Sequence, residues 1–152
     1  MYVLTVISKF VSMGYRNTEF EYRYQRDTEL IKAYNTVLSD IRPPFNMCDV
    51  LARAVKLPCS RFWVSETRAK TVIAKMKHGY DLLDMKPNKR KMFEEIYRRV
   101  VELEKLGPVE IGDVLESGAP EFYLTTESAK VIIHYAKKRW LEKKLKQLRH
   151  YW

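Results

Sequence analysis

Hydrophobic residues recur every three to four positions along most of this chain, the spacing of one face of an α-helix. The clearest case lies within residues 18–42, where apolar side chains occupy positions 30, 31, 34, 37, 38 and 41. Pro43-Pro44 cannot continue a helix, so this helix is expected to begin near Thr18 and to end before them. No long stretch alternates with the two-residue period of a strand. The pattern therefore predicts an all-α protein.

Five further helices are predicted, with ends marked by capping residues. The hydroxyls of Ser65 and Thr125 suit the N-cap position of two of them, and Gly79 suits the turn that ends the first. Prolines and glycines separate the others. The predicted ranges are 46–55, 65–79, 88–106, 111–117 and 125 to the C-terminus.

The second half of the chain repeats features of the first. An aromatic pair, an aliphatic residue, a hydroxyl cap, Ala-Lys and an aliphatic pair recur in the same register in 62–73 and 122–133. Asp-Val-Leu at 49–51 recurs at 113–115, four residues closer to the aromatic pair. We expect a helical bundle built from two tandem three-helix repeats (helix, helix, aromatic turn, helix), with a chance match as the alternative. The predicted division is an N-terminal segment 1–17 of undefined order, a first repeat 18–86, and a second repeat 87–152 with a basic C-terminal helix.

The aromatic pairs have two interpretations. Val64 and Leu124 directly precede the hydroxyl caps and can staple the chain onto the first helical turn. The aromatic residues before them are expected to plug the gap between helices. The alternative is a stacking platform for nucleic-acid bases, for which Trp63 and Tyr123 are the better candidates because they are more amphipathic.

Charge is the feature that bears most on function. The 152 residues carry 28 Lys+Arg against 19 Asp+Glu, a net charge of +9. By segment, the net charge is +2 in 1–60, +6 in 61–91, −5 in 92–136 and +6 in 137–152. Two basic segments flanking an acidic one suggest a polyanionic partner. The alternatives are an acidic protein surface, the acidic middle of the chain itself, or membrane headgroups.

Composition and length limit the remaining classes. The length allows one compact domain or two very small ones. No apolar run reaches the roughly 18 residues of a membrane span, and the N-terminus lacks the charged region and cleavage site of a secretory signal. Two cysteines do not form a disulfide framework, so we expect a reducing, cytoplasmic setting, in a bacterial host cell or a virion.

No catalytic constellation is visible in the sequence. The three histidines and two cysteines do not have metal-ligand spacing, and the glycines are scattered singly rather than in a phosphate-binding loop. Acidic pairs such as Glu94-Glu95 are typical of a solvated helix face. We expect no enzyme activity, no cofactor and no metal.

The C-terminal helix carries the clearest functional pattern, because cations interleave with Trp140 and three leucines. A second basic cluster follows the Ser65 cap, where the helix would be the recognition helix of a helix-turn-helix, although the preceding turn is longer than that motif allows. The candidate nucleic-acid-binding residues are Arg68, Lys70, Lys75, Lys77, Lys89, Arg90, Lys91, Lys137, Lys138, Arg139, Lys143, Lys144, Lys146 and Arg149.

Four stretches resemble a known group of proteins. They are FWVSE at 62–66, KMFEEIYRRV at 91–100, FYLT at 122–125 and LRHY at 148–151. Together they resemble small basic proteins encoded by phages and mobile elements of gut bacteria, over about residue 20 to the end. The resemblance implies a viral or mobile-element context and carries no activity with it.

The sequence thus predicts a non-catalytic nucleic-acid-binding protein, with DNA preferred to RNA, acting as a helix-turn-helix-like regulator of a phage or mobile element. Binding would be driven by phosphate contacts. The alternative is a structural or adaptor protein that uses the amphipathic basic C-terminal helix to bind a protein partner or a second copy. No membrane partner is expected.

Overall fold

The computed structural model describes residues 15–150, with side chains described from Tyr22 onward. The first 14 residues of the predicted N-terminal segment lie outside this range. The described residues form six helices and no strand, so the all-α prediction is confirmed. The helices are α2 (Tyr15–Asp40), α3 (Met47–Ala54), α4 (Glu66–Lys77), α5 (Pro87–Glu104), α6 (Ile111–Glu116) and α7 (Thr126–Arg149).

The predicted caps set the ends of the two helices that follow the aromatic pairs. The Arg68 backbone N–H donates to the Ser65 hydroxyl at 3.2 Å, and the Ser128 N–H donates to the Thr125 hydroxyl at 3.1 Å. Gly79 follows the end of α4 with a φ of +87°, a conformation that a residue with a Cβ rarely adopts. The predicted N-caps of α4 and α7 and the predicted glycine at the end of α4 are therefore confirmed.

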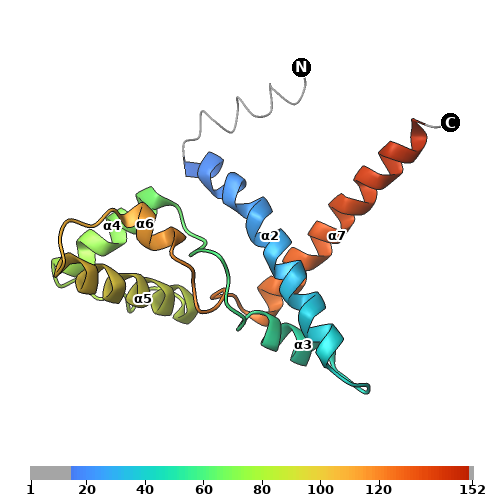
Figure 1. The fold of residues 1–152 in the computed structure, drawn as a ribbon, viewed down its shortest axis with the longest axis horizontal. Coiled ribbons are helices and arrows are strands. Elements are labelled where there is room, and N and C mark those ends of the chain that lie inside the picture. Colours follow the sequence, from blue (N-terminus) through green and yellow to red (C-terminus); the bar gives the residue numbers. More distant parts are fainter. Residues whose placement is uncertain (1–14, 151–152) are drawn as a thin grey trace.

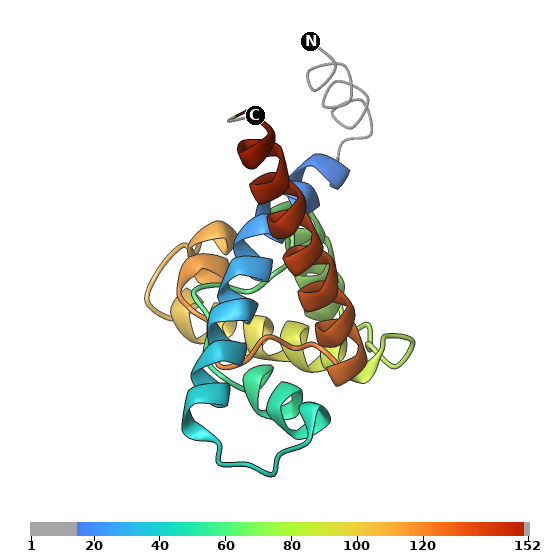
Figure 2. The same ribbon diagram turned by 90° about the vertical axis from the view of Figure 1, so that its right-hand side faces the viewer.

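The six helices pack as two groups of three, and each group draws on both halves of the chain. The α7 group consists of α2, α3 and α7, which contact one another; the α4 group consists of α4, α5 and α6. Figure 1 shows the two groups on either side of a central connection, and Figure 2 shows α2 and α7 side by side above α3. The third helix of each predicted repeat therefore packs on the first two helices of the other.

This exchange bears on the helix-turn-helix interpretation. Such a motif requires two consecutive helices that pack on each other across a short turn. Here α3 contacts α2 and α7, whereas α4 contacts α5 and α6, and α3 and α4 make no extended contact. The consecutive pair α3–α4 is therefore not a helix-turn-helix, because the long segment between the two helices carries α4 into the other group.

Residues 55–64, which follow α3, and residues 115–124, which run from the last turn of α6 toward α7, meet at the centre and are called the crossover here. Cys59 and Ala119 form an isolated antiparallel bridge with N···O distances of 3.0 and 2.9 Å. On either side, the Phe62 N–H donates to the Leu115 carbonyl and the Phe122 N–H donates to the Val55 carbonyl, both at 2.9 Å. The two bonds are reciprocal: Phe122 lies sixty residues after Phe62, and Leu115 lies sixty residues after Val55.

Side chains at the crossover follow the same rule. Phe62 stacks on Tyr123 with ring centroids 6.1 Å apart, and Trp63 stacks on Phe122 at 6.5 Å. Lys56 pairs with Glu121 at 3.0 Å, while Arg61 lies 4.0 Å from Glu116. When each residue is replaced by the one sixty positions away, the Phe62–Tyr123 contact becomes the Phe122–Trp63 contact. The same exchange converts Lys56–Glu121 into Glu116–Arg61, so the acid and the base change places.

One part of the predicted repeat has a spacing other than sixty. The sequence matches 49–51 with 113–115, a spacing of 64. The reciprocal bonds instead relate Val55 to Leu115, which are both buried. Both spacings occur in the structure: α3 and α6 begin 64 residues apart, at Met47 and Ile111, whereas the crossover bonds relate residues sixty apart.

The hydrophobic core is continuous through both groups and the crossover. Its largest fully buried side chains are Phe62, Phe93, Leu30, Ile73, Ile96, Leu115, Val50, Val72, Val100 and Val114. Two charged residues, Asp27 and Arg61, are also buried. Within the range described, no helix is both long and apolar enough to cross a membrane.

Candidate nucleic-acid interface

The outer part of α7 leaves the body of the protein. Ile133 is the last buried residue of the helix, and every residue from Lys137 to His150 is exposed. We call residues 137–150 the α7 arm. Figure 1 shows it extending away from the other helices. A helix that continues beyond its packing partners offers its whole circumference to another molecule.

The α7 arm carries seven cations and one acid, Glu142. Arg139 donates to Asp27 of α2 at 2.6 Å, while Lys137 lies 5.1 Å from the Tyr34 ring centre and Lys144 lies 4.4 Å from that of Trp140. The contacts of Arg139 and Lys137 fix the base of the arm to α2, whereas the contact of Lys144 lies within the arm. Within residues 22–150, the structure shows no ion pair for the remaining four cations, which are Lys138, Lys143, Lys146 and Arg149.

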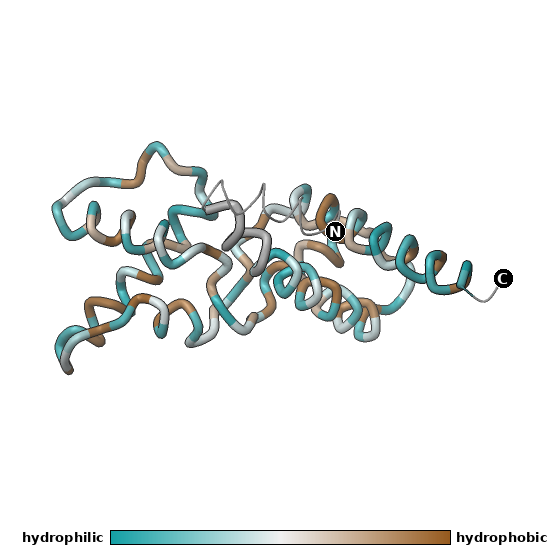
Figure 3. Tube along the Cα trace, turned by 90° about the horizontal axis from the view of Figure 1, so that it is seen from above, coloured by the Kyte–Doolittle hydropathy of each residue, from teal (hydrophilic) through white to brown (hydrophobic). Residues whose placement is uncertain are grey.

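Three leucines form a stripe on the arm that lies beside the packing side of α7 rather than on it. Leu141, Leu145 and Leu148 are 53%, 48% and 56% exposed and lie on one face because they are four and three residues apart. The packing side passes through Ile133 and Ala136, and at 3.6 residues per turn the stripe lies roughly a third of a turn from it. Figure 3 shows mostly hydrophilic residues along these turns, with hydrophobic positions among them.

The second predicted cluster lies on the exposed face of α4. Lys70 pairs with Glu66 at 3.0 Å, and Lys77 pairs with Glu104 of α5. Arg68 and Lys75 are exposed, and in the part of the chain that is described they form no ion pair. About half of the predicted charge on α4 is therefore engaged with neighbouring acids.

The remaining predicted cations lie in the first turns of α5. Lys89 and Lys91 are exposed and Arg90 is half-buried. A helix N-terminus carries a positive partial charge, so these cations add to a positive helix end rather than offset it. This site lies in the α4 group, and the α7 arm lies in the other group, so the structure separates the two basic segments rather than merging them into one patch.

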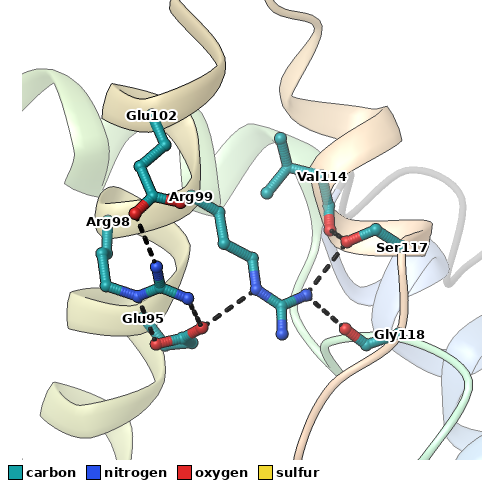
Figure 4. A network of polar contacts seen from close by, with 7 residues as sticks. All are labelled: Glu95, Arg98, Arg99, Glu102, Val114, Ser117 and Gly118. Atoms are coloured by element: carbon teal, nitrogen blue, oxygen red, sulfur yellow. Dashed lines mark hydrogen bonds and ion pairs between the residues drawn. The ribbon is translucent and has the colours of Figure 1, made fainter.

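Further along α5, the arginines are neutralised by a local network (Figure 4). Arg98 donates to both Glu95 and Glu102, and Arg99 donates to Glu95, Ser117 and the Gly118 carbonyl. Hydrogen bonds from Arg98, reinforced by Arg99, lower the pKa of the Glu95 carboxyl below its ordinary value despite partial burial. The network joins α5 to the crossover and leaves little free charge for an anion.

Trp63 and Tyr123, the predicted stacking candidates, lie at the crossover. Both are half-buried, and each has one ring face against a phenylalanine of the other segment. Burial raises the pKa of the Tyr123 phenol to about 12. This placement favours the interpretation of the aromatic pairs as a plug between helices over that of a stacking platform.

Cys59 lies at the crossover as a buried free cysteine. Its Sγ lies within hydrogen-bond distance of the carbonyl oxygens of Arg61 (3.3 Å) and Glu121 (3.4 Å), and burial raises its pKa to about 11. The thiol is therefore protonated at neutral pH and is a poor nucleophile. No set of three potential metal ligands comes together in the described part of the chain.

One exposed cation, Lys130, is missing from the predicted interface. It lies on α7 sixty residues after Lys70, in the Ala-Lys pair that follows each hydroxyl cap. The recurrence of that pair was the signal that could have included it.

No family model, curated protein or solved structure matches this chain.

Proposed function

We propose that this chain is a non-catalytic nucleic-acid-binding protein that contacts phosphates through the α7 arm and through the basic face of α4 and early α5, with DNA preferred to RNA. The observation that carries the proposal is the α7 arm, where seven cations stand against one acid on a helix that leaves the body of the protein. Such a helix can lie along a phosphate backbone with cations available on several sides.

Phosphate contacts would supply most of the affinity, because each neutralised phosphate releases counterions. Any sequence readout would come from Arg68, Lys70 and Lys75, the cations on the exposed face of α4. Lys70 must first leave Glu66, to which it is bound at 3.0 Å. Arg68 and Lys75 need no such exchange and are the stronger candidates for contacts to bases. A phage or mobile-element regulator is the biological context that the sequence resemblance supports.

The test is the salt dependence of binding to a labelled random-sequence duplex, measured by fluorescence anisotropy. Seven or eight phosphate contacts predict a loss of roughly 10⁴-fold in affinity between about 50 and 200 mM salt. The variant Lys138→Gln/Lys143→Gln/Lys146→Gln is expected to lower the slope of log K against log salt by about 3. Lys32→Gln/Arg42→Gln/Lys105→Gln, which removes the same charge from exposed positions elsewhere, is the matched control.

Two outcomes would contradict the proposal. No binding of the unmodified protein at the lower salt would exclude nucleic acid as the partner of this surface. Equal slopes for the arm variant and its control would show that net charge alone drives association, and that the α7 arm is not the site.

We also infer that the chain arose by tandem duplication of a three-helix unit. The inference is supported by the recurring pattern at 62–73 and 122–133 and by the crossover contacts, each of which has a counterpart sixty residues away. In this view each unit donates its last helix to the other, which is domain swapping within one chain.

The second candidate function is an adaptor or structural protein, and the leucine stripe favours it. Leu141, Leu145 and Leu148 are about half exposed on a side of α7 that the body does not use. An amphipathic helix of this kind can lay its apolar face into a partner's groove. A molecular mass that rises with concentration in analytical ultracentrifugation, and that Leu145→Gln keeps at the monomer value, would support self-association instead.

A further inference from the structure

We propose that one chain acts as the equivalent of a two-fold dimer and binds a DNA duplex through two half-sites, with α4 at one and α7 at the other. This inference rests on the proposed function and adds the form of the ligand. Its basis is the symmetry of the crossover rather than the amount of positive charge.

The crossover has the contact pattern of an isologous interface. In such an interface, residue i of one partner contacts residue j of the other, and j contacts i in return. Here the bridge between Cys59 and Ala119 maps onto itself when sixty is added or subtracted, and the Phe62–Leu115 bond maps onto the Phe122–Val55 bond. A two-fold axis through the bridge produces this pattern, and it exchanges α4 for α7.

The two exchanged helices also carry cations at equivalent positions. Lys70 corresponds to Lys130 and Lys77 to Lys137, and all four residues are exposed. Lys77 contacts Glu104 on α5, and Lys137 lies over Tyr34 on α2. Each third helix is therefore fixed to the long helix of its own group through the same position.

Duplex DNA matches such a protein because its backbone has local two-fold axes. Dimeric DNA-binding proteins use this property by placing one helix on each half-site, so that the symmetry of the protein mirrors that of the site. Figure 1 shows α4 and α7 on opposite sides of the crossover, as two half-sites require. A single strand has no such axis, so the geometry favours a duplex.

The two helices would bind with unequal strength. On α4, Arg68 and Lys75 are exposed, and no ion pair to a described residue holds either of them. The arm of α7 adds Lys138, Lys143, Lys146 and Arg149. We therefore expect α7 to supply more of the phosphate contacts and α4 to supply the second point of attachment.

The experiment compares the salt slope of duplex binding for two matched double variants. One is Arg68→Gln/Lys75→Gln on α4, and the other is Lys138→Gln/Lys143→Gln on α7; Lys32→Gln/Lys105→Gln is the control. Each of the first two is expected to reduce the slope by about 2, and their combination by about 4. Sedimentation of the saturated complex is expected to give one chain per duplex of about two turns.

The outcomes separate this inference from the proposed function. A reduced slope for the α7 variant, with the α4 variant equal to the control, would overturn the two-site inference and leave nucleic-acid binding intact. Two chains per duplex of this length would overturn it as well, because each chain would then occupy one half-site. An unmodified protein that does not bind at low salt would contradict both.

Discussion

The α4 group and the α7 group share a plan but differ in how their third helices end. The helix α4 has 12 residues and stops at Gly79, whereas α7 has 24 and continues as the arm. Acids of the α4 group engage Lys70 and Lys77, while the arm carries Glu142 alone. The crossover therefore determines how the three helices of each group pack, whereas helix length and the placement of acidic residues change the surface charge without changing that packing.

The two groups also hold their third helices differently. In the α7 group, Asp27 is 4% exposed and accepts from both Arg26 and Arg139, so the acid that anchors α7 is shielded from water. In the α4 group, the ion pair that joins the third helix to the long helix is Lys77–Glu104, which lies on the surface. A longer helix that carries much like charge is thus held by the stronger attachment.

The largest expected effect comes from breaking the crossover in both groups. Phe62→Ala and Phe122→Ala each remove a ring that is 0% or 2% exposed, and each is expected to lower the free energy of unfolding by about 3–5 kcal/mol. Urea denaturation would measure both. Because the positions are equivalent, their costs should agree within about 1 kcal/mol, close to the error of such measurements. Phe45→Ala, at an exposed ring, is the control, and unequal costs would argue against equivalence.

A smaller effect is expected from the buried anchor of α7. Asp27→Asn removes the charge that Arg26 and Arg139 share, and should cost about 2 kcal/mol, since Arg139 is half exposed and can turn to water. Lys77→Gln breaks the surface anchor of α4 and should cost under about 1 kcal/mol. Equal losses in urea denaturation would contradict the contrast between the groups.

The N-caps provide a finer comparison of the same two helices. Ser65 is 7% exposed and Thr125 is exposed, so the hydroxyl that caps α4 lies in the more buried site of the two. We expect Ser65→Ala to cost about 1–2 kcal/mol and Thr125→Ala about 0.5–1 kcal/mol. Thermal denaturation would give the order, and a reversed order would show that cap burial does not decide the cost.

The smallest expected effect is a pH dependence specific to the α4 group. The folded pKa of Glu95 lies below its ordinary value because Arg98 and Arg99 donate to it. The stabilisation is therefore complete above the ordinary carboxyl pKa of about 4.3 and is lost as the pH falls through the lowered folded value. The stability difference between the unmodified protein and Glu95→Gln should shrink from pH 7 to pH 3. A constant difference in urea denaturation would contradict this assignment.

Local features of the fold could be predicted from the sequence because local interactions determine them. The period of Leu30, Tyr34 and Val37 identified the buried face of α2, and Ser65 and Thr125 marked where α4 and α7 begin. Pro87 likewise stands at the first turn of α5. In each case the signal lies within a few residues of the structure that it specifies.

The exchange of α4 and α7 could not be predicted in the same way. The spacing of Ala69, Val72 and Ile73 shows that one face of α4 is buried, but not which helices bury it. Those partners depend on the path of 55–64, a segment with no helical period. The burial of Asp27 also escaped prediction, since its partner Arg139 is 112 residues away. The exposure of most candidate cations could be predicted more directly, because exposed cations need no partner within the chain to be recognised, and their role in binding nucleic acid stays a prediction.

The crossover also determines the order in which the chain can fold during synthesis. The helices α2 and α3 leave the ribosome first, but the helix that completes their group, α7, leaves after all the others. The α4 group needs only consecutive helices and can close while α7 is still being made. The last contacts to form are those of α7 with α2, such as the Arg139–Asp27 pair, which joins residues 112 positions apart, and such non-local contacts slow folding relative to a simple helical bundle. We therefore expect folding to start in the α4 group and to end when α7 packs on α2 and α3.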